Sequence, residues 1–190
     1  MSKEFFEVFP TKLGLHAAPE SYPQDLKGIV PSPTGDKRSD YVLKYQGIAS
    51  KVGRAFGINP LVILAQAAIE SGWGTSNLVV NHNNFFGVTA YGSVNPYWKG
   101  GKYISTSSGL PFRTYDSVEA GFSDFARLLV SKYREAAKAS PSVTEYARLI
   151  ASSPYINEKN GDNRSKYKEL IIRNAVAISM IAKKFQSLHN

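Results

Sequence analysis

One carboxylate near the middle of the chain has surroundings that suit acid–base chemistry. Glu70 is the last residue of an almost wholly apolar stretch, PLVILAQAAIE at 60–70, and Ser71-Gly-Trp-Gly74 follows at once. Burial disfavours the charged carboxylate, and so does the negative end of a helix dipole. Both effects raise its pKa, which a general acid working near neutral pH requires. The alternative is a structural ion pair between Glu70 and a Lys or Arg, because such pairs also perturb pKa values.

A helix buried on every side has to position this acid. Asn59 and Pro60 form a favourable N-cap and first-turn pair, so the helix is predicted to begin there. Gly72 is the residue type that ends helices, and it follows just beyond Glu70. The stretch is apolar all round except for Gln66 and Glu70, which lie four residues apart and therefore share one face. Gln66 is accordingly predicted to bind substrate beside the acid.

Apolar residues at three- and four-residue steps predict further helices around the buried one. They are expected from Tyr41 to Gly57, from Asp116 with Asp-x-x-Glu119 as its capping arrangement, from Ser142 with Glu145 three residues later, and along Ile171, Ala175, Ile178, Ile181 and Phe185. Between them, residues 103–106 and 112–115 are predicted to pair as a hairpin across Gly109. The predicted fold class is mainly α (α+β), a helical domain with a small β-hairpin lobe.

Residues 1–38 differ from the remainder of the chain. They contain Pro10, Pro19, Pro23, Pro31 and Pro33 and show no helical period of useful length. We interpret them as an irregular N-terminal arm or a linker, and residues 39–190 as the catalytic domain. The N-terminal segment MSKEFFEVFP lacks the hydrophobic core of a secretory signal.

Composition narrows the function classes. The 190 residues suit one domain, and the chain has no Cys, so disulfides and thiolate metal sites are excluded. The histidines at 16, 82 and 189 show no metal-ligand spacing, and we expect neither metal nor cofactor. The net charge of +8 suits an anionic polymer such as a bacterial cell wall, or simply a basic soluble surface. Without a zinc finger, RNP motif or Arg-rich arm, we expect no nucleic-acid partner. No apolar run approaches the ~20 residues of a membrane span, and we expect a monomer.

Four motifs in order resemble a known family. They are AAIESGWGTS at 67–76, NNFFGV at 83–88, FRTYDSVEAGFSDF at 112–125 and SPYI at 153–156. Together they resemble glycoside hydrolase family 73, the bacterial and phage glucosaminidases that cut peptidoglycan and include flagellar rod-associated hydrolases. The resemblance covers roughly residues 40–185 and implies a lysozyme-like helical fold and cleavage after N-acetylglucosamine. It also implies that Glu70 is the catalytic acid. Tyr155 falls at the family's aromatic position, although the usual Gly-Tyr-Ala-Thr reads Pro-Tyr-Ile-Asn here.

Several side chains near these motifs suit binding of an acetamido sugar. The predicted substrate contacts beside Gln66 are Trp73, Asn83, Asn84, Phe85, Tyr91 and Tyr103. An aromatic ring stacks on a sugar, and an amide matches the donor and acceptor of the acetamido group. Each also has a structural alternative: core packing for Trp73 and Phe85, turn formation for the asparagines, and an ordinary hairpin face for the tyrosines.

One departure from the usual glycosidase pattern affects the mechanism. Most glycosidases place two carboxylates across the scissile bond, and in this family the second commonly comes from the β-lobe. Here no Asp or Glu lies between Ser71 and Tyr115. The next acids, Asp116, Glu119 and Asp124, fall at a predicted helix start, and Glu158 and Asp162 lie near Tyr155 in the sequence.

The sequence therefore predicts a peptidoglycan hydrolase with Glu70 as general acid and with help from the substrate's own N-acetyl group or from a positioned water. Two alternatives stay open: a lytic transglycosylase or muramidase with a single catalytic Glu, and a non-catalytic wall-binding module. We expect action on the cell wall, in the periplasm or outside the cell. Export would use a holin, a secretion machine or a signal absent from this sequence.

Overall fold

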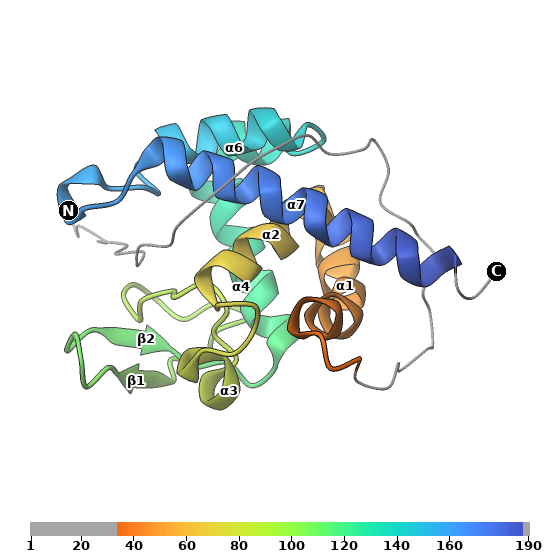
Figure 1. Cartoon of the computed structure of the whole chain (residues 1–190). Helices are drawn as coiled ribbons and strands as arrows, with labels where there is room; N and C mark the ends of the chain where they lie inside the picture. The colour runs from red at the N-terminus through yellow and green to blue at the C-terminus, as the bar shows by residue number, and fades with distance from the viewer. Residues whose placement is uncertain (1–33, 188–190) are drawn as a thin grey trace.

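The computed structural model describes residues 34–187, of which Asn160 is described in its backbone alone. The described part of the chain contains seven α-helices, a short 3-10 helix and one hairpin (Figure 1). In chain order they are α1 (Lys37–Phe56), α2 (Pro60–Glu70), α3 (Asn77–His82), β1 (Lys102–Ile104), β2 (Pro111–Arg113), α4 (Val118–Lys132), α5 (Arg134–Ala139), α6 (Val143–Ser152), η1 (Glu158–Asn160) and α7 (Arg164–Ser187). This confirms the predicted mainly helical domain with a β-hairpin lobe.

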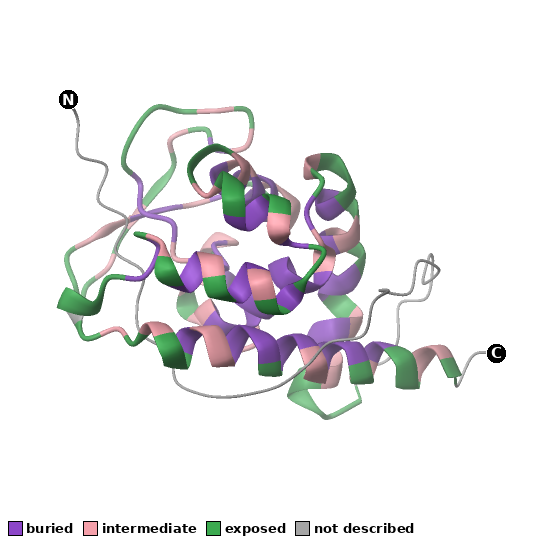
Figure 2. Ribbon diagram, turned by 90° about the horizontal axis from the view of Figure 1, so that it is seen from above, coloured by how far each residue is buried: buried purple, intermediate pink, exposed green. Residues whose placement is uncertain are grey.

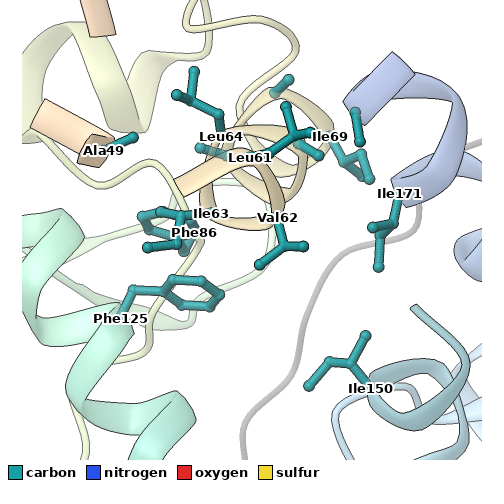
Figure 3. Packing of buried hydrophobic residues seen from close by; sticks show 14 of the residues in the cluster. Ala49, Leu61, Val62, Ile63, Leu64, Ile69, Phe86, Phe125, Ile150 and Ile171 are labelled. Atoms are coloured by element: carbon teal, nitrogen blue, oxygen red, sulfur yellow. The ribbon is translucent and has the colours of Figure 1, made fainter. Parts of the chain in front are cut away.

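The helix that carries Glu70 lies at the centre of the domain. The Asn59 side chain accepts a hydrogen bond from the Leu61 amide, and Pro60 takes the first turn, as predicted. Every residue from 61 to 69 is buried. Side chains of α1, α4, α6 and α7 pack around the helix, as Figure 3 shows, and the ribbon in Figure 2 marks the buried residues along the helices. A helix enclosed on all sides is held rigidly, so the residue at its end has a fixed position.

Long-range packing ties the last third of the chain to this central helix. The longest helix, α7, packs against α2, α6 and α1, and it crosses the whole domain in Figure 1. Ile171, Ala175 and Ile178 of its predicted stripe are buried, whereas Ile181 and Phe185 are only partly buried. Residues about 100 positions apart in the sequence are thereby brought together at the C-terminal end of α2.

The lobe is a short antiparallel hairpin beside α3, apart from α6 and α7 (Figure 1). Tyr103 pairs with Phe112, which confirms the predicted pairing around Gly109, although each strand is only three residues long. A buried polar network on α4 anchors the lobe. Asp124 accepts hydrogen bonds from Arg113 Nη1 at 2.7 Å, from the Tyr115 hydroxyl at 2.9 Å, and from Asn95 and Arg127. With four donors satisfied, this carboxylate has a structural role.

Two helix starts differ from the prediction. α1 begins at Lys37, four residues before Tyr41, because Asp36 caps it by accepting a hydrogen bond from the Ser39 amide. α4 begins one residue later than the Asp116 arrangement implied, because the Ser117 hydroxyl accepts from the Ala120 amide. The Gly57 end of α1 and the Ser142 cap of α6 are as predicted.

Most of the predicted N-terminal arm, residues 1–33, lies outside the described residues, and its last two residues belong to α1. Among residues 34–187 no helix combines the length and the apolar character needed to cross a membrane. The same residues contain no group of three or more His, Cys, Asp or Glu side chains arranged to hold a metal ion.

Candidate active site

Glu70 ends α2 at a turn that holds it in place. The Ser71 hydroxyl donates to the Ala67 carbonyl and accepts from the Gly74 amide at 2.7 Å. Gly72, Trp73 and Gly74 then follow in left-handed conformation, with φ of 57°, 62° and 75°. A Cβ at Gly74 would stand 3.2 Å from the rings of Tyr41 and Tyr45, so both the backbone and the space there favour glycine.

A chain of hydrogen bonds reaches the Glu70 carboxyl from the protein interior. The Tyr167 hydroxyl on α7 donates to Glu70 Oε1 at 2.6 Å. Gln66 Nε2, one turn before Glu70, donates to that hydroxyl at 3.0 Å. The Tyr146 hydroxyl on α6 donates in turn to Gln66 Oε1. Gln66 and Glu70 therefore share one face of α2, as their spacing predicted, and both contact the same tyrosine.

The electrostatic surroundings suit Glu70 to proton donation. Burial raises the pKa of Glu70 from an ordinary value of 4.5 to about 8. The hydrogen bond from Tyr167 acts in the opposite direction and the negative charge of Asp162 acts in the same direction. No Lys or Arg forms an ion pair with Glu70 among the described residues, so the ion-pair alternative lacks support. At neutral pH the side chain holds its proton.

Tyr155 lies beside this acid with its hydroxyl buried. Its ring packs edge-on against Tyr133 and tilted against Tyr167, with centroids 5.4 and 5.9 Å apart. The hydroxyl makes no hydrogen bond of standard geometry within the described residues, although the Tyr167 hydroxyl lies close enough to lower its pKa. Burial raises the pKa of Tyr155 well above its ordinary value, and the nearby Glu70 charge adds to the effect. A buried hydroxyl without a partner costs about 1–3 kcal/mol, which points to a partner supplied by water or substrate.

Three predicted substrate contacts lie in the interior. Asn84 is 1% exposed; its Nδ2 donates to the Val88 and Arg113 carbonyls and its Oδ1 accepts from the Val88 amide. Phe85 is fully buried and packs against Tyr45 and Phe122. Gln66 is fully buried and engaged at both ends by tyrosines. These contacts give all three structural or positioning roles and leave no surface for a sugar.

Trp73, three residues after the acid, and Asn83 each have protein partners of their own. Trp73 is partly exposed and meets Tyr41 edge-on, with the Arg38 guanidinium 4.9 Å from its ring centroid. Asn83 ends α3 with φ of 54°, and its Nδ2 donates to the Tyr115 carbonyl. Both residues therefore make the contacts of their structural alternatives, and their role in binding sugar stays a prediction.

The lobe presents two of its tyrosines at the surface. Tyr91 is 40% exposed, and Tyr103 is partly exposed and stacks on His82 at 4.3 Å between centroids. Trp98, by contrast, is buried beneath the Arg113 guanidinium and donates its Nε1–H to the Gly101 carbonyl.

Comparison with known proteins agrees with this architecture. The family model described as mannosyl-glycoprotein endo-beta-N-acetylglucosaminidase matches residues 46–179. The chain belongs to this glucosaminidase family. The matched range includes Glu70, Tyr155 and Tyr167.

Relatives of this glucosaminidase-family chain differ in overall length. Peptidoglycan hydrolase FlgJ of Vibrio cholerae is 32% identical over 126 residues, which cover 60% of this chain and 36% of that protein. The chain thus spans about a third of that relative. The glycoside hydrolase domain of Salmonella typhimurium FlgJ superposes with a TM-score of 0.58 at 25% identity, covering 80% of this chain and 97% of that domain. A chain of a type VI secretion system effector-immunity complex from Pseudomonas protegens shares the fold, with a TM-score of 0.57, 19% identity, and coverage of 76% and 94%.

Sequence reasoning missed two tyrosines of this glucosaminidase-family site. Tyr167 and Tyr146 contact the Gln66–Glu70 face from α7 and α6. Each carries an apolar ring within an amphipathic helix, so its periodicity marks it as a core residue. The available signal was the polar pair Gln66 and Glu70, because buried polar groups require hydrogen-bonding partners from neighbouring elements.

Proposed function

We propose that this chain is a peptidoglycan hydrolase that cleaves the glycan strand after N-acetylglucosamine, with Glu70 as the general acid. The observation that carries the proposal is the Glu70 carboxyl itself, with its pKa raised to about 8 at the end of a rigid buried helix. Membership of the glucosaminidase family and the similarity to a peptidoglycan hydrolase support the substrate class. Because that polymer lies outside the cytoplasmic membrane, the proposed site of action is the periplasm or the exterior of the cell.

In the proposed reaction, protonated Glu70 gives its proton to the glycosidic oxygen as the bond to the anomeric carbon breaks. The β-lobe contributes no carboxylate, because residues 71–115 contain none. We propose that the N-acetyl oxygen of the substrate attacks the anomeric carbon and that water then opens the resulting ring. The unpartnered Tyr155 hydroxyl is the proposed protein group that orients the acetamido group or the water.

The other acids fit a catalytic role less well. Asp124 is fully buried and engaged by four donors, and Glu119 pairs with Lys51 at 2.8 Å. Asp162 is the acid whose charge acts on Glu70, so it is the carboxylate that a two-carboxylate mechanism would use. On the substrate side, Tyr91 and Tyr103 of the lobe, together with Trp73 and Asn83, are the proposed sugar contacts.

The absence of an acid from residues 71–115 also favours a second candidate, a lytic transglycosylase that needs a single Glu. There the substrate's own hydroxyl replaces water and a 1,6-anhydro sugar is formed. A purely wall-binding module is less consistent with the site, because a buried acid destabilises a fold that does not use it.

Mass spectrometry of muropeptides after digestion of purified peptidoglycan tests the proposal, with Glu70→Gln as the matched inactive control. Reducing-end N-acetylglucosamine is the expected product. Reducing-end N-acetylmuramic acid would identify a muramidase and anhydro-muramic products a transglycosylase. The absence of products from the wild-type protein would favour the binding module.

A further inference from the structure

Four side chains from three helices form a buried hydrogen-bonded chain that ends at the candidate acid. Tyr146 and Gln66 are fully buried and Tyr167 is 4% exposed. Since none of the three reaches solvent appreciably, the protons of this chain are ordered by the protein alone.

The recorded hydrogen bonds give the chain one direction, and each bond in it depends on the next. A hydroxyl carries one proton, and an amide has distinct donor and acceptor ends. Gln66 Oε1 accepts from Tyr146, so Gln66 Nε2 is the end that donates to the Tyr167 oxygen. The single proton of Tyr167 is then left for Glu70 Oε1, 2.6 Å away. An ionised Glu70 can only accept, so it permits this direction alone; the reverse direction would require a protonated Glu70 to donate to Tyr167, with every bond of the chain turned round together.

We propose that Tyr167 is the positioning residue of the catalytic acid, held in the donating orientation by Gln66 and Tyr146, and that it assigns the transferable proton to Glu70 Oε2. With Oε1 occupied as an acceptor, the protonated carboxyl carries its hydrogen on the other oxygen. That oxygen is therefore the one that faces the glycosidic bond. The inference rests on the proposed role of Glu70.

The hydrogen bond from Tyr167 changes the pKa of Glu70 in a definite direction. A donor to a carboxylate stabilises its charged form, so Tyr167 holds the pKa of Glu70 below the value that burial alone would give. Removing the donor raises that pKa and keeps the acid protonated to higher pH. Strengthening the donor lowers it.

The test is the pH dependence of kcat/KM on soluble peptidoglycan fragments, where the basic limb reports the free enzyme's acid. For Tyr167→Phe we expect the basic limb to move up by about one pH unit or more and kcat to fall about tenfold. Site-specific replacement of Tyr167 by 3,5-difluorotyrosine keeps the ring and makes a stronger donor, so the limb should move down. Tyr133→Phe, which alters a neighbouring tyrosine outside the chain, should leave the limb in place.

Opposite shifts in these two variants would support the positioning role, because a packing defect cannot produce both. An unchanged limb in both variants, or a uniform loss of rate at every pH without a limb shift, would overturn it. If Tyr167→Phe does not fold, the fluorinated protein alone tests the positioning role: a basic limb moved to lower pH supports it, and an unmoved limb overturns it. An active Glu70→Gln protein would instead refute the proposed function, so the two failures are distinguishable.

Discussion

The raised pKa of Glu70 has a consequence for stability that can be measured without substrate. Below pH 4.5 the carboxyl is protonated in both the folded and the unfolded chain. Between 4.5 and about 8 the folded protein keeps the proton while the unfolded chain loses it. The free energy of unfolding must therefore fall as pH rises through this interval and level off above it.

The magnitude follows from the width of the interval. About 3.5 pH units at roughly 1.4 kcal/mol each give an upper value of about 5 kcal/mol. Glu70 keeps some solvent exposure, so a measured effect of about 2–5 kcal/mol is the expectation. Glu70→Gln cannot ionise, and its side-chain carbonyl can still accept from Tyr167.

Urea denaturation of both proteins from pH 4 to pH 9 isolates this effect, because titrations common to the two proteins cancel in the difference. We expect nearly equal stability at pH 4 and a Glu70→Gln protein that is more stable by about 2–5 kcal/mol at pH 9. Glu135→Gln at the surface of α5 is the matched control for the chemical change itself. A Glu70→Gln difference that stays constant from pH 4 to pH 9 would refute the reasoning.

Three further substitutions separate chemistry from structure. Tyr155→Phe removes the hydroxyl proposed to orient the acetamido group or the water, so activity on peptidoglycan should fall more than about tenfold. Because that hydroxyl is buried without a hydrogen bond, the melting temperature should stay level or rise. Full activity would contradict the role of Tyr155. Asn84→Ala removes three buried hydrogen bonds and leaves the Val88 amide without its acceptor, although the Val88 carbonyl keeps its bond from the Arg113 amide. It should cost about 2–4 kcal/mol in denaturant titrations, with kcat retained by the folded protein. A stable variant with a raised KM would restore the sugar-binding interpretation. Asp162→Asn removes a charge that raises the pKa of Glu70, so the basic limb of the pH–rate profile should move to lower pH. A ~10²–10⁴-fold rate loss in that variant would instead make Asp162 the general base and exclude substrate assistance.

The sequence was most informative where local chemistry and burial agree. The Asn59–Pro60 start, the apolar run and Glu70 together predicted a buried helix with an acid at its end, and the structure has that helix. The same local information placed Asn84 and Phe85 among the substrate contacts, whereas both side chains are buried. An NNFFG segment is polar and then aromatic, which suits a sugar site and a buried turn equally well. In the structure two of the Asn84 hydrogen bonds go to Val88, four residues further on, and the third goes to the Arg113 carbonyl of β2.

The hydrogen-bond partners of Glu70 could not be predicted from local sequence patterns, for a different reason. Tyr167 lies 97 residues after Glu70, and its contact depends on how α7 packs on α2. The register of two helices is set by the whole core, and no spacing in the sequence encodes it. The start of α1 differed from the prediction because Asp36 caps the helix before its first periodic apolar residue, and the start of α4 differed because Ser117 rather than Asp116 provides the cap.

The anchoring of the lobe through Asp124 makes its tip replaceable. Every bond to that carboxylate comes from residues 95, 113, 115 and 127, and none from the exposed turn between β1 and β2. The turn at residues 105–110 can therefore change in length and composition without loosening the attachment of the lobe to α4. This turn can therefore be replaced, by natural variation or by engineering, without changing Glu70 or the tyrosines hydrogen-bonded to it.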